Sequence, residues 1–64
     1  MAAQIVTVAL VKRPGRWGGW RIRTTTERGA VRYQGDYEQR DHTAAHVAAS
    51  RLARRHGADF EEFQ

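Results

Sequence analysis

The run from Gln4 to Val11 constrains the fold most, because nearly every residue in it is apolar or β-branched. Alternation divides its side chains between two faces of a strand, with Val6, Val8 and Leu10 on one face and Ile5, Thr7, Ala9 and Val11 on the other. A strand that is apolar on both faces is typical of the centre of a sheet. Residues 4–11 therefore predict a central strand, around which the rest of the chain must be arranged.

Two further strands are predicted after this one, over residues 19–26 and 30–37, because both runs are rich in β-branched and aromatic residues. Between the first two strands, residues 12–18 predict a basic loop. Pro14-Gly15 favours a turn there, since proline fixes φ and glycine allows positive φ. Three strands in sequence order form an antiparallel meander.

The connection between the second and third strands is short. Glu27-Arg28-Gly29 is typical of a hairpin, with Gly29 in the left-handed region. Gly35-Asp36 marks either a bulge or the end of the third strand. We expect Tyr37 to share the side of Tyr33 unless a bulge intervenes.

An alanine-rich segment over about 43–56 predicts a helix, since alanine, leucine and arginine are good helix formers. Asp41 or Thr43 is expected to cap its start, and Gly57 to follow its end. Its apolar stripe contains Ala45, Ala48, Ala49 and Leu52, with Ala44 and Val47 near the edges. Residues 57–64 form an acidic tail. Within it, Ala58 to Phe63 predict a short extra strand or a hydrophobic tail, with Phe60 and Phe63 covering an end of the core.

The predicted fold class is α+β: a three-stranded antiparallel meander packed on one C-terminal helix (βββα), in a single small domain over residues 1–64. If both later strands alternate in step, their side chains divide into two sets. Trp20, Ile22, Val31 and Tyr33 face the helix, and Arg21, Arg23, Arg32 and Gln34 face away from it. The face away from the helix is then a basic surface.

Charge indicates the class of partner. The net charge is +4, all 11 Lys and Arg residues precede Gly57, and three of the 7 acidic residues follow it. A basic body favours anionic partners, either a nucleic acid, with DNA preferred, or an acidic protein surface. Ten of the basic residues are Arg, whose planar fork suits phosphate. Codon usage in a GC-rich genome explains the same ratio, and an ordinary solvated sheet face explains the same alternation.

Three features favour a protein that stays inside the cell. The chain has no cysteine, so it has neither disulfides nor a thiolate metal site. It contains no apolar run of the roughly 18 residues needed to span a membrane, and its N-terminus lacks the basic start of a signal peptide. We expect a cytoplasmic protein that does not bind membranes.

The loop and its flanks supply the other candidate binding residues. Arg13 and Arg16 are candidates for phosphate contacts, and Trp20 is expected in the core. Trp17 either stacks on a base or anchors a protein contact, or else folds back over the edge of the core. Arg51, Arg54 and Arg55 form a second basic strip on the helix or simply its solvated flank.

The run Gly19-Trp20-Arg21-Ile22-Arg23, the glycine-containing hairpin, the basic third strand and the Thr43-led helix together resemble the arm-site DNA-binding domain of phage tyrosine recombinases. The resemblance covers residues 18–56. It implies a sheet inserted into the DNA major groove, with DNA contacts from Arg21, Arg23 and Arg32 and phosphate contacts around Arg13 and Arg16. The chain departs from that family at His42, where an aromatic residue is usual, and it carries no catalytic domain.

In size and layout the chain also resembles small phage accessory proteins such as anti-CRISPR inhibitors. That resemblance implies an alternative function, binding to a host defence or regulatory protein. The contact would then centre on Trp17, Tyr37 or Phe63 with arginines around it. If the protein is of phage origin, its compartment is the bacterial host cytoplasm. A homodimer is compatible with either function, because Ile5, Ala9 and Val11 would leave an apolar patch on the second face of the first strand.

Catalysis is not expected. The sequence has no nucleophile–base pair, no paired carboxylates and no phosphate-binding glycine motif. His42 and His46 are four residues apart and could bracket a metal, but cysteine is absent and only Asp41 or the distant His56 offers a further ligand. The sequence therefore predicts a non-enzymatic binding protein without a metal or another cofactor.

Overall fold

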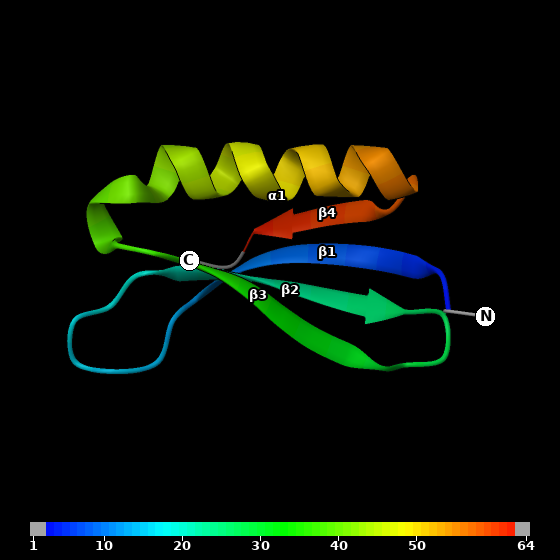
Figure 1. Ribbon diagram of the computed structural model, residues 1–64, viewed down its shortest axis with the longest axis horizontal. Helices are drawn as coiled ribbons and strands as arrows, with labels where there is room; N and C mark the ends of the chain where they lie inside the picture. Colours follow the sequence, from blue (N-terminus) through cyan, green and yellow to red (C-terminus); the bar gives the residue numbers. More distant parts are fainter. Residues whose placement is uncertain (1–2, 63–64) are drawn as a thin grey trace.

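The computed structural model describes residues 3–62, and in them a four-stranded sheet is covered on one face by one α-helix (Figure 1). In chain order the elements are β1 (Ile5–Lys12), β2 (Trp20–Thr26), β3 (Val31–Tyr37), the 3-10 turn η1 (Gln39–Asp41), α1 (His42–His56) and β4 (Asp59–Glu62). The strand order is β3-β2-β1-β4. The first three strands form the predicted antiparallel meander, and β4 pairs parallel to β1. The predicted α+β class and the central position of the first strand are confirmed.

The core lies between α1 and the two middle strands. Val8 and Leu10 of β1 are completely buried, and Trp20 and Ile22 of β2 nearly so. The helix meets them with three alanines one turn apart, Ala45, Ala49 and Ala53. Because alanine has only a methyl side chain, α1 lies close to the sheet and its contacts are mainly with β1. The expected core position of Trp20 is confirmed. Ala53 extends the predicted apolar stripe, while Ala48 and Leu52 pack at its edge.

The two ends of α1 differ from each other in how they are capped. At the C-terminus, Gly57 adopts φ 61° and its N–H donates to the Arg54 carbonyl, while the Ala58 N–H donates to the Ala53 carbonyl. This is the left-handed glycine ending that the sequence predicted. At the N-terminus Asp41, one of the two predicted capping residues, occupies the N-cap position, but its side chain makes no capping hydrogen bond, because η1 leads directly into the helix.

A bulge near the start of β1 changes which residue enters the core. The pairing with β2 shifts between Ile5 and Thr7, so Ile5 packs against the core while Val6 is 38% exposed. The sequence predicted the opposite for these two residues, because strict alternation carries no information about an inserted residue. Ala9 is also fully buried. The second face of β1 is therefore less apolar than expected, which weakens the argument for a dimer through that face.

The register of the β2–β3 hairpin also differs from the prediction. The Thr26 N–H donates to the Ala30 carbonyl, and the pairing continues as Thr25 with Val31 and Arg23 with Tyr33. Residues opposite each other in an antiparallel pair share a face. Tyr33 and Val31 therefore lie with Arg23 on the face away from α1, and Tyr33 is 54% exposed where a core position was expected.

At the end of β3, a bulge at Gly35 changes which side chains face the core. Its φ is 74°, and the pairing shifts between Trp20–Tyr37 and Ile22–Gln34, so two β3 residues stand opposite Arg21. This is the bulge that Gly35-Asp36 suggested. Because of it, Tyr37 turns to the helix side and packs against the core, while Tyr33 stays on the opposite side. Over residues 3–62, no helix is both long and apolar enough to cross a membrane.

Candidate nucleic-acid interface

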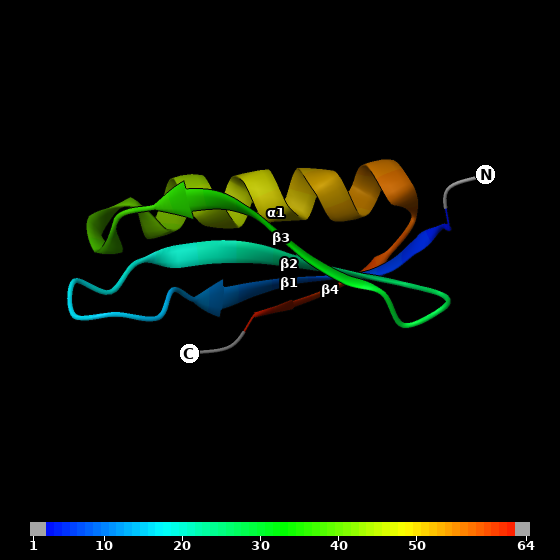
Figure 2. The same cartoon turned by 60° about the horizontal axis from the view of Figure 1, so that its bottom comes forward.

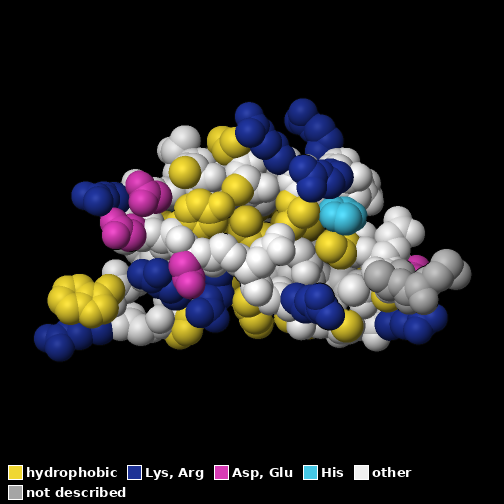
Figure 3. All heavy atoms as spheres, in the orientation of Figure 1, with side chains coloured by type: hydrophobic (Ala, Val, Ile, Leu, Met, Phe, Trp, Pro, Cys, Tyr) yellow, Lys and Arg dark blue, Asp and Glu magenta, His cyan; other side chains and the backbone are white. Residues whose placement is uncertain are grey.

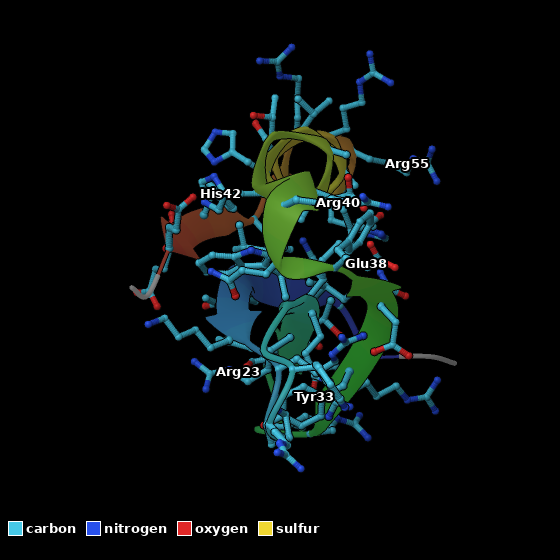
Figure 4. All side chains as sticks on the ribbon, turned by 90° about the vertical axis from the view of Figure 1, so that its left-hand side faces the viewer. Arg23, Tyr33, Glu38, Arg40, His42 and Arg55 are labelled. Carbon is cyan, nitrogen blue, oxygen red and sulfur yellow. The ribbon has the colours of Figure 1, made fainter. Side chains whose placement is uncertain are left out.

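Arg21 and Arg23 of β2 lie on the sheet face opposite α1, as the sequence predicted. The strand pairings arrange its side chains in rows across the sheet. Asp59 and Glu61 come from β4, Thr7, Ala9 and Val11 from β1, Arg21, Arg23 and Thr25 from β2, and Val31 and Tyr33 from β3. Figure 4 shows Arg23 and Tyr33 on the side of the sheet away from the helix. We call this surface the open face.

The centre of the basic half of the open face is an arginine–tyrosine contact. The guanidinium carbon of Arg21 lies 5.5 Å from the centre of the Tyr33 ring, a cation–π distance. Arg21 is the diagonal neighbour of Tyr33, and Arg23 is directly opposite it. Cross-strand pairing thus places two arginines and one exposed aromatic residue next to one another on the sheet, with the Arg21 guanidinium in contact with the ring. Such a set can bind a phosphate and stack a base at the same place.

The structure separates the four residues predicted to share the basic face. Arg32 pairs with Thr24 and Gln34 pairs with Ile22, so both lie on the helix side of the sheet, away from Arg21 and Arg23. The prediction of a single face was wrong because the hairpin loop contains three residues, 27–29. Because the loop has three residues, odd-numbered residues of β2 pair with odd-numbered residues of β3. Counting from the predicted hairpin would have placed Tyr33 beside Arg23.

Arg13 is held within the protein. Its Nε–H donates to the Gly18 carbonyl at 2.9 Å, and its guanidinium lies 3.8 Å from a carboxylate oxygen of Asp36. Its side chain is only 26% exposed. Arg13 therefore closes the loop between β1 and β2 and links that loop to β3, and its guanidinium is partly neutralised before any phosphate is bound.

The tip of the same loop carries exposed residues. Trp17 is 83% exposed, and the guanidinium carbon of Arg16 lies 5.7 Å from its ring centre. Figure 2 shows this loop extending past the end of the sheet. Of the two alternatives for Trp17, the exposed ring is the one observed. It forms a second arginine–aromatic pair, matching Arg21 with Tyr33.

The loop is fixed at its base by Gln39 of η1. The Gly19 N–H donates to the Gln39 side-chain oxygen at 3.1 Å, and the Trp20 indole N–H donates to the Gln39 carbonyl at 3.3 Å. Both bonds tie the start of β2 to the turn that precedes the helix. The exposed tip is therefore held at a defined end of the sheet.

The opposite edge of the open face is acidic. Asp59 pairs with Thr7 and Glu61 with Ala9, so both carboxylates belong to the β4 half of this face. The expected acidic tail is thus partly a strand within the sheet, and it lies two strands away from Arg23 in the same row. Like charge keeps phosphates away from this edge. The β2–β3 half is therefore the part of this face whose charge suits an anionic ligand.

His42 and His46 have a structural role on the helix side. His42 Nε2 lies 3.2 Å from one carboxylate oxygen of Glu62, and His46 Nδ1 lies 2.8 Å from the other. The His42 ring also packs edge-on against Trp20, and the His46 ring against Phe60. The two histidines thus link α1 to β4. Within residues 3–62, no cluster of three acidic, histidine or cysteine side chains is arranged to hold a metal ion.

Two of the predicted aromatic contacts have different outcomes. Phe60 is partly buried and packs against the core, as expected. Phe63 lies outside the described residues.

Comparisons of the chain with known protein families, with characterised proteins and with solved structures found no match.

Proposed function

We propose that this protein binds single-stranded nucleic acid, DNA in the first instance, through the β2–β3 half of its open face. The observation that carries the proposal is the cation–π pair of Arg21 with the exposed ring of Tyr33, with Arg23 beside it. Arginine supplies charge-assisted contacts to phosphate, and an exposed aromatic ring supplies a stacking platform for a base. The exposed Arg16–Trp17 pair at the loop tip offers a second position of the same kind.

The shape and charge of this surface favour a single strand over a duplex. Only half of the open face is basic, and the acidic residues Asp59 and Glu61 occupy the other half. A duplex lying across the whole sheet would bring phosphates against those carboxylates. A single strand running along β2 and β3 avoids them and has unstacked bases available for Tyr33.

The test is fluorescence anisotropy with a labelled mixed-sequence single strand and the matching duplex. We expect Arg21→Ala and Arg23→Ala each to weaken single-strand binding by about tenfold, as the loss of one charge-assisted contact implies. Arg32→Ala is the matched control, because it removes the same charge from the neighbouring strand on the opposite face. Equal losses at Arg23 and Arg32 would indicate general charge attraction instead of a site.

Tyr33 distinguishes stacking from charge. Tyr33→Ala removes the ring without changing the net charge, and we expect single-strand affinity to fall about tenfold. Duplex affinity should change little, because paired bases are not available for stacking. If the substitution leaves single-strand binding unchanged, the stacking part of the proposal is wrong.

A further inference from the structure

A groove separates α1 from β3 on the helix side of the sheet, distinct from the open face. It has a volume of about 470 Å³ and is lined by Ile22, Gln34, Gly35, Tyr37, Ala48, Arg51, Leu52 and Arg55. It exists because α1 lies mainly over β1 and does not cover β3. Figure 3 shows hydrophobic side chains gathered between the helix and the strands below it, with Lys and Arg side chains along the helix.

The groove has an apolar floor and a basic rim. Ile22 is buried at 4% exposure, and Tyr37 and Leu52 pack beside it as partly buried side chains. Arg51 and Arg55, one helical turn apart, form the helix rim, and Arg55 points toward the β3 side in Figure 4. No acidic residue lines it, and within residues 3–62 no carboxylate makes an ion pair with Arg51 or Arg55. The surface is therefore apolar and positively charged without internal compensation.

Within the part of the chain that the structure describes, no strand pairs with the β3 edge next to the groove. β3 is the outermost strand, and every residue in it except Tyr37 is exposed. The bond from the Thr26 N–H to the Ala30 carbonyl sets the alternation, so the pairs Thr24–Arg32 and Ile22–Gln34 bond across to β2. The backbone groups of Val31 and Tyr33 then point outward. This edge offers donors and acceptors to an added strand.

We propose that the β3 edge and the groove together dock an extended, acidic segment of a partner protein. The segment pairs with the outward backbone groups of Val31 and Tyr33. Its carboxylates meet Arg32, Arg51 and Arg55, and an apolar side chain enters the groove above Ile22. The docking surface shares Tyr33 with the proposed nucleic-acid surface, through its backbone in one case and its ring in the other, but Arg21, Arg23 and Trp17 do not belong to it.

The charge of this surface distinguishes between three ligands: a second copy of the chain, a nucleic acid and an acidic peptide. A second copy pairing through β3 would bring Arg32 and the groove arginines of both chains together, a like-charge contact that is unfavourable. A nucleic acid finds phosphate partners on the rim, but the floor of Ile22 and Leu52 offers nothing to its charged backbone. An acidic peptide with alternating apolar residues satisfies the edge, the rim and the floor together.

The test starts with a displayed library of random peptides of about ten residues, the upper length of an ordinary strand. Selection on the whole protein should enrich peptides that alternate acidic and β-branched residues. An enriched peptide, made synthetically and labelled, is then titrated by anisotropy. Arg51→Glu and Arg55→Glu should each weaken it by about tenfold, because each places like charge against its carboxylates. Arg54→Glu is the matched control, being outside the groove lining.

A second variant tests the strand edge. Val31→Pro removes one outward N–H, and proline is tolerated where an edge N–H faces solvent, so the fold should be retained. We expect it to abolish peptide binding. Amide NMR shifts should map the peptide to β3 and α1.

Several results would overturn the proposal. They are a selection without enriched peptides, peptides that map to the open face, and equal losses at Arg54 and Arg55. A dimer by light scattering that Val31→Pro converts to a monomer would replace the partner peptide with a second copy. A peptide displaced by single-stranded DNA would show that both ligands share the open face.

Discussion

At the scale of the residue, Gly19 occupies a backbone position that no other residue can take without moving its neighbours. Its φ is 115°, and a Cβ there would overlap the Tyr37 carbonyl and stand 2.9 Å from the Arg13 guanidinium. Gly19 can therefore lie against the Tyr37 carbonyl and the Arg13 guanidinium while the Gln39 side-chain oxygen accepts a hydrogen bond from its N–H. The position of the exposed loop tip thus depends on a residue at the base of the loop.

We expect Gly19→Ala to destabilise the protein by about 2–3 kcal/mol, through backbone strain and the steric clash. Gly29→Ala is the matched control: its φ is also positive, at 85°, but a Cβ there meets nothing within 4 Å. It should cost only about 1–2 kcal/mol. Urea unfolding monitored by tryptophan fluorescence measures both. If the two variants lose equal stability, packing at Gly19 contributes nothing beyond its backbone conformation.

The register of the β2–β3 hairpin decides on which face of the sheet Tyr33 lies. From alternation alone it was expected in the core, whereas the hairpin pairs it with Arg23 on the open face. The three-residue hairpin loop carries that information in the sequence. The bulge at Gly35 then turns Tyr37 toward the core, so the two tyrosines of β3 lie on opposite faces of the sheet.

At the scale of the element, β4 is the shortest strand of the sheet. It is four residues long and pairs only with β1. Its attachment to α1 comes from Phe60 and from Glu62, whose two carboxylate oxygens contact His42 and His46. One carboxylate thus joins the start of the helix to the end of the last strand.

We expect Glu62→Ala to reduce stability by about 1–2 kcal/mol, because both hydrogen bonds to histidine are lost. Asp59→Ala is the control, since it removes the same charge from the same strand on the opposite face. Native-state hydrogen exchange should show faster exchange of the β4 amides in Glu62→Ala alone. Unchanged β4 exchange would mean that Phe60 and the backbone pairing suffice to hold this strand.

At the scale of the whole molecule, the sheet separates the basic residues into two surfaces. Arg21 and Arg23 face away from the helix, while Arg32 shares the helix side with the groove arginines. The acidic strand β4 limits the open face at one edge. One small chain thereby presents a proposed nucleic-acid surface and a proposed peptide surface on opposite sides.

Salt dependence follows from this division. If Arg16, Arg21 and Arg23 neutralise phosphates of a single strand, the logarithm of the binding constant should fall with the logarithm of salt with a slope of about −2. Arg21→Ala/Arg23→Ala should reduce the slope to about −0.7, since one contact remains. Arg32→Ala should leave it unchanged. Anisotropy titrations across a salt series measure all three slopes, and a slope that depends on Arg32 would contradict the assignment of faces.

Local sequence was sufficient for the first three strands, for the helix and for their order along the chain, whereas residues 58–63 fitted either a strand or a tail. The β-branched run at 4–11, the turn residues Pro14-Gly15, and the alanine-rich segment ending at Gly57 are short-range signals, each produced by the backbone preferences of the residues themselves. Burial of Trp20 followed from the same alternation.

Which residues share a surface was decided by tertiary structure, because pairing between strands sets it. A bulge changes the face of the side chains on one side of it: the bulge between Ile5 and Thr7 brings Ile5 to the core in place of Val6, and the one at Gly35 brings Tyr37 to the helix side. The groove depends in the same way on where α1 lies over the sheet. The sequence therefore predicts a basic sheet packed on a helix, and its hairpin loop contains the information that divides the arginines between two faces. Only the packed structure shows where the bulges fall and which groove α1 leaves open.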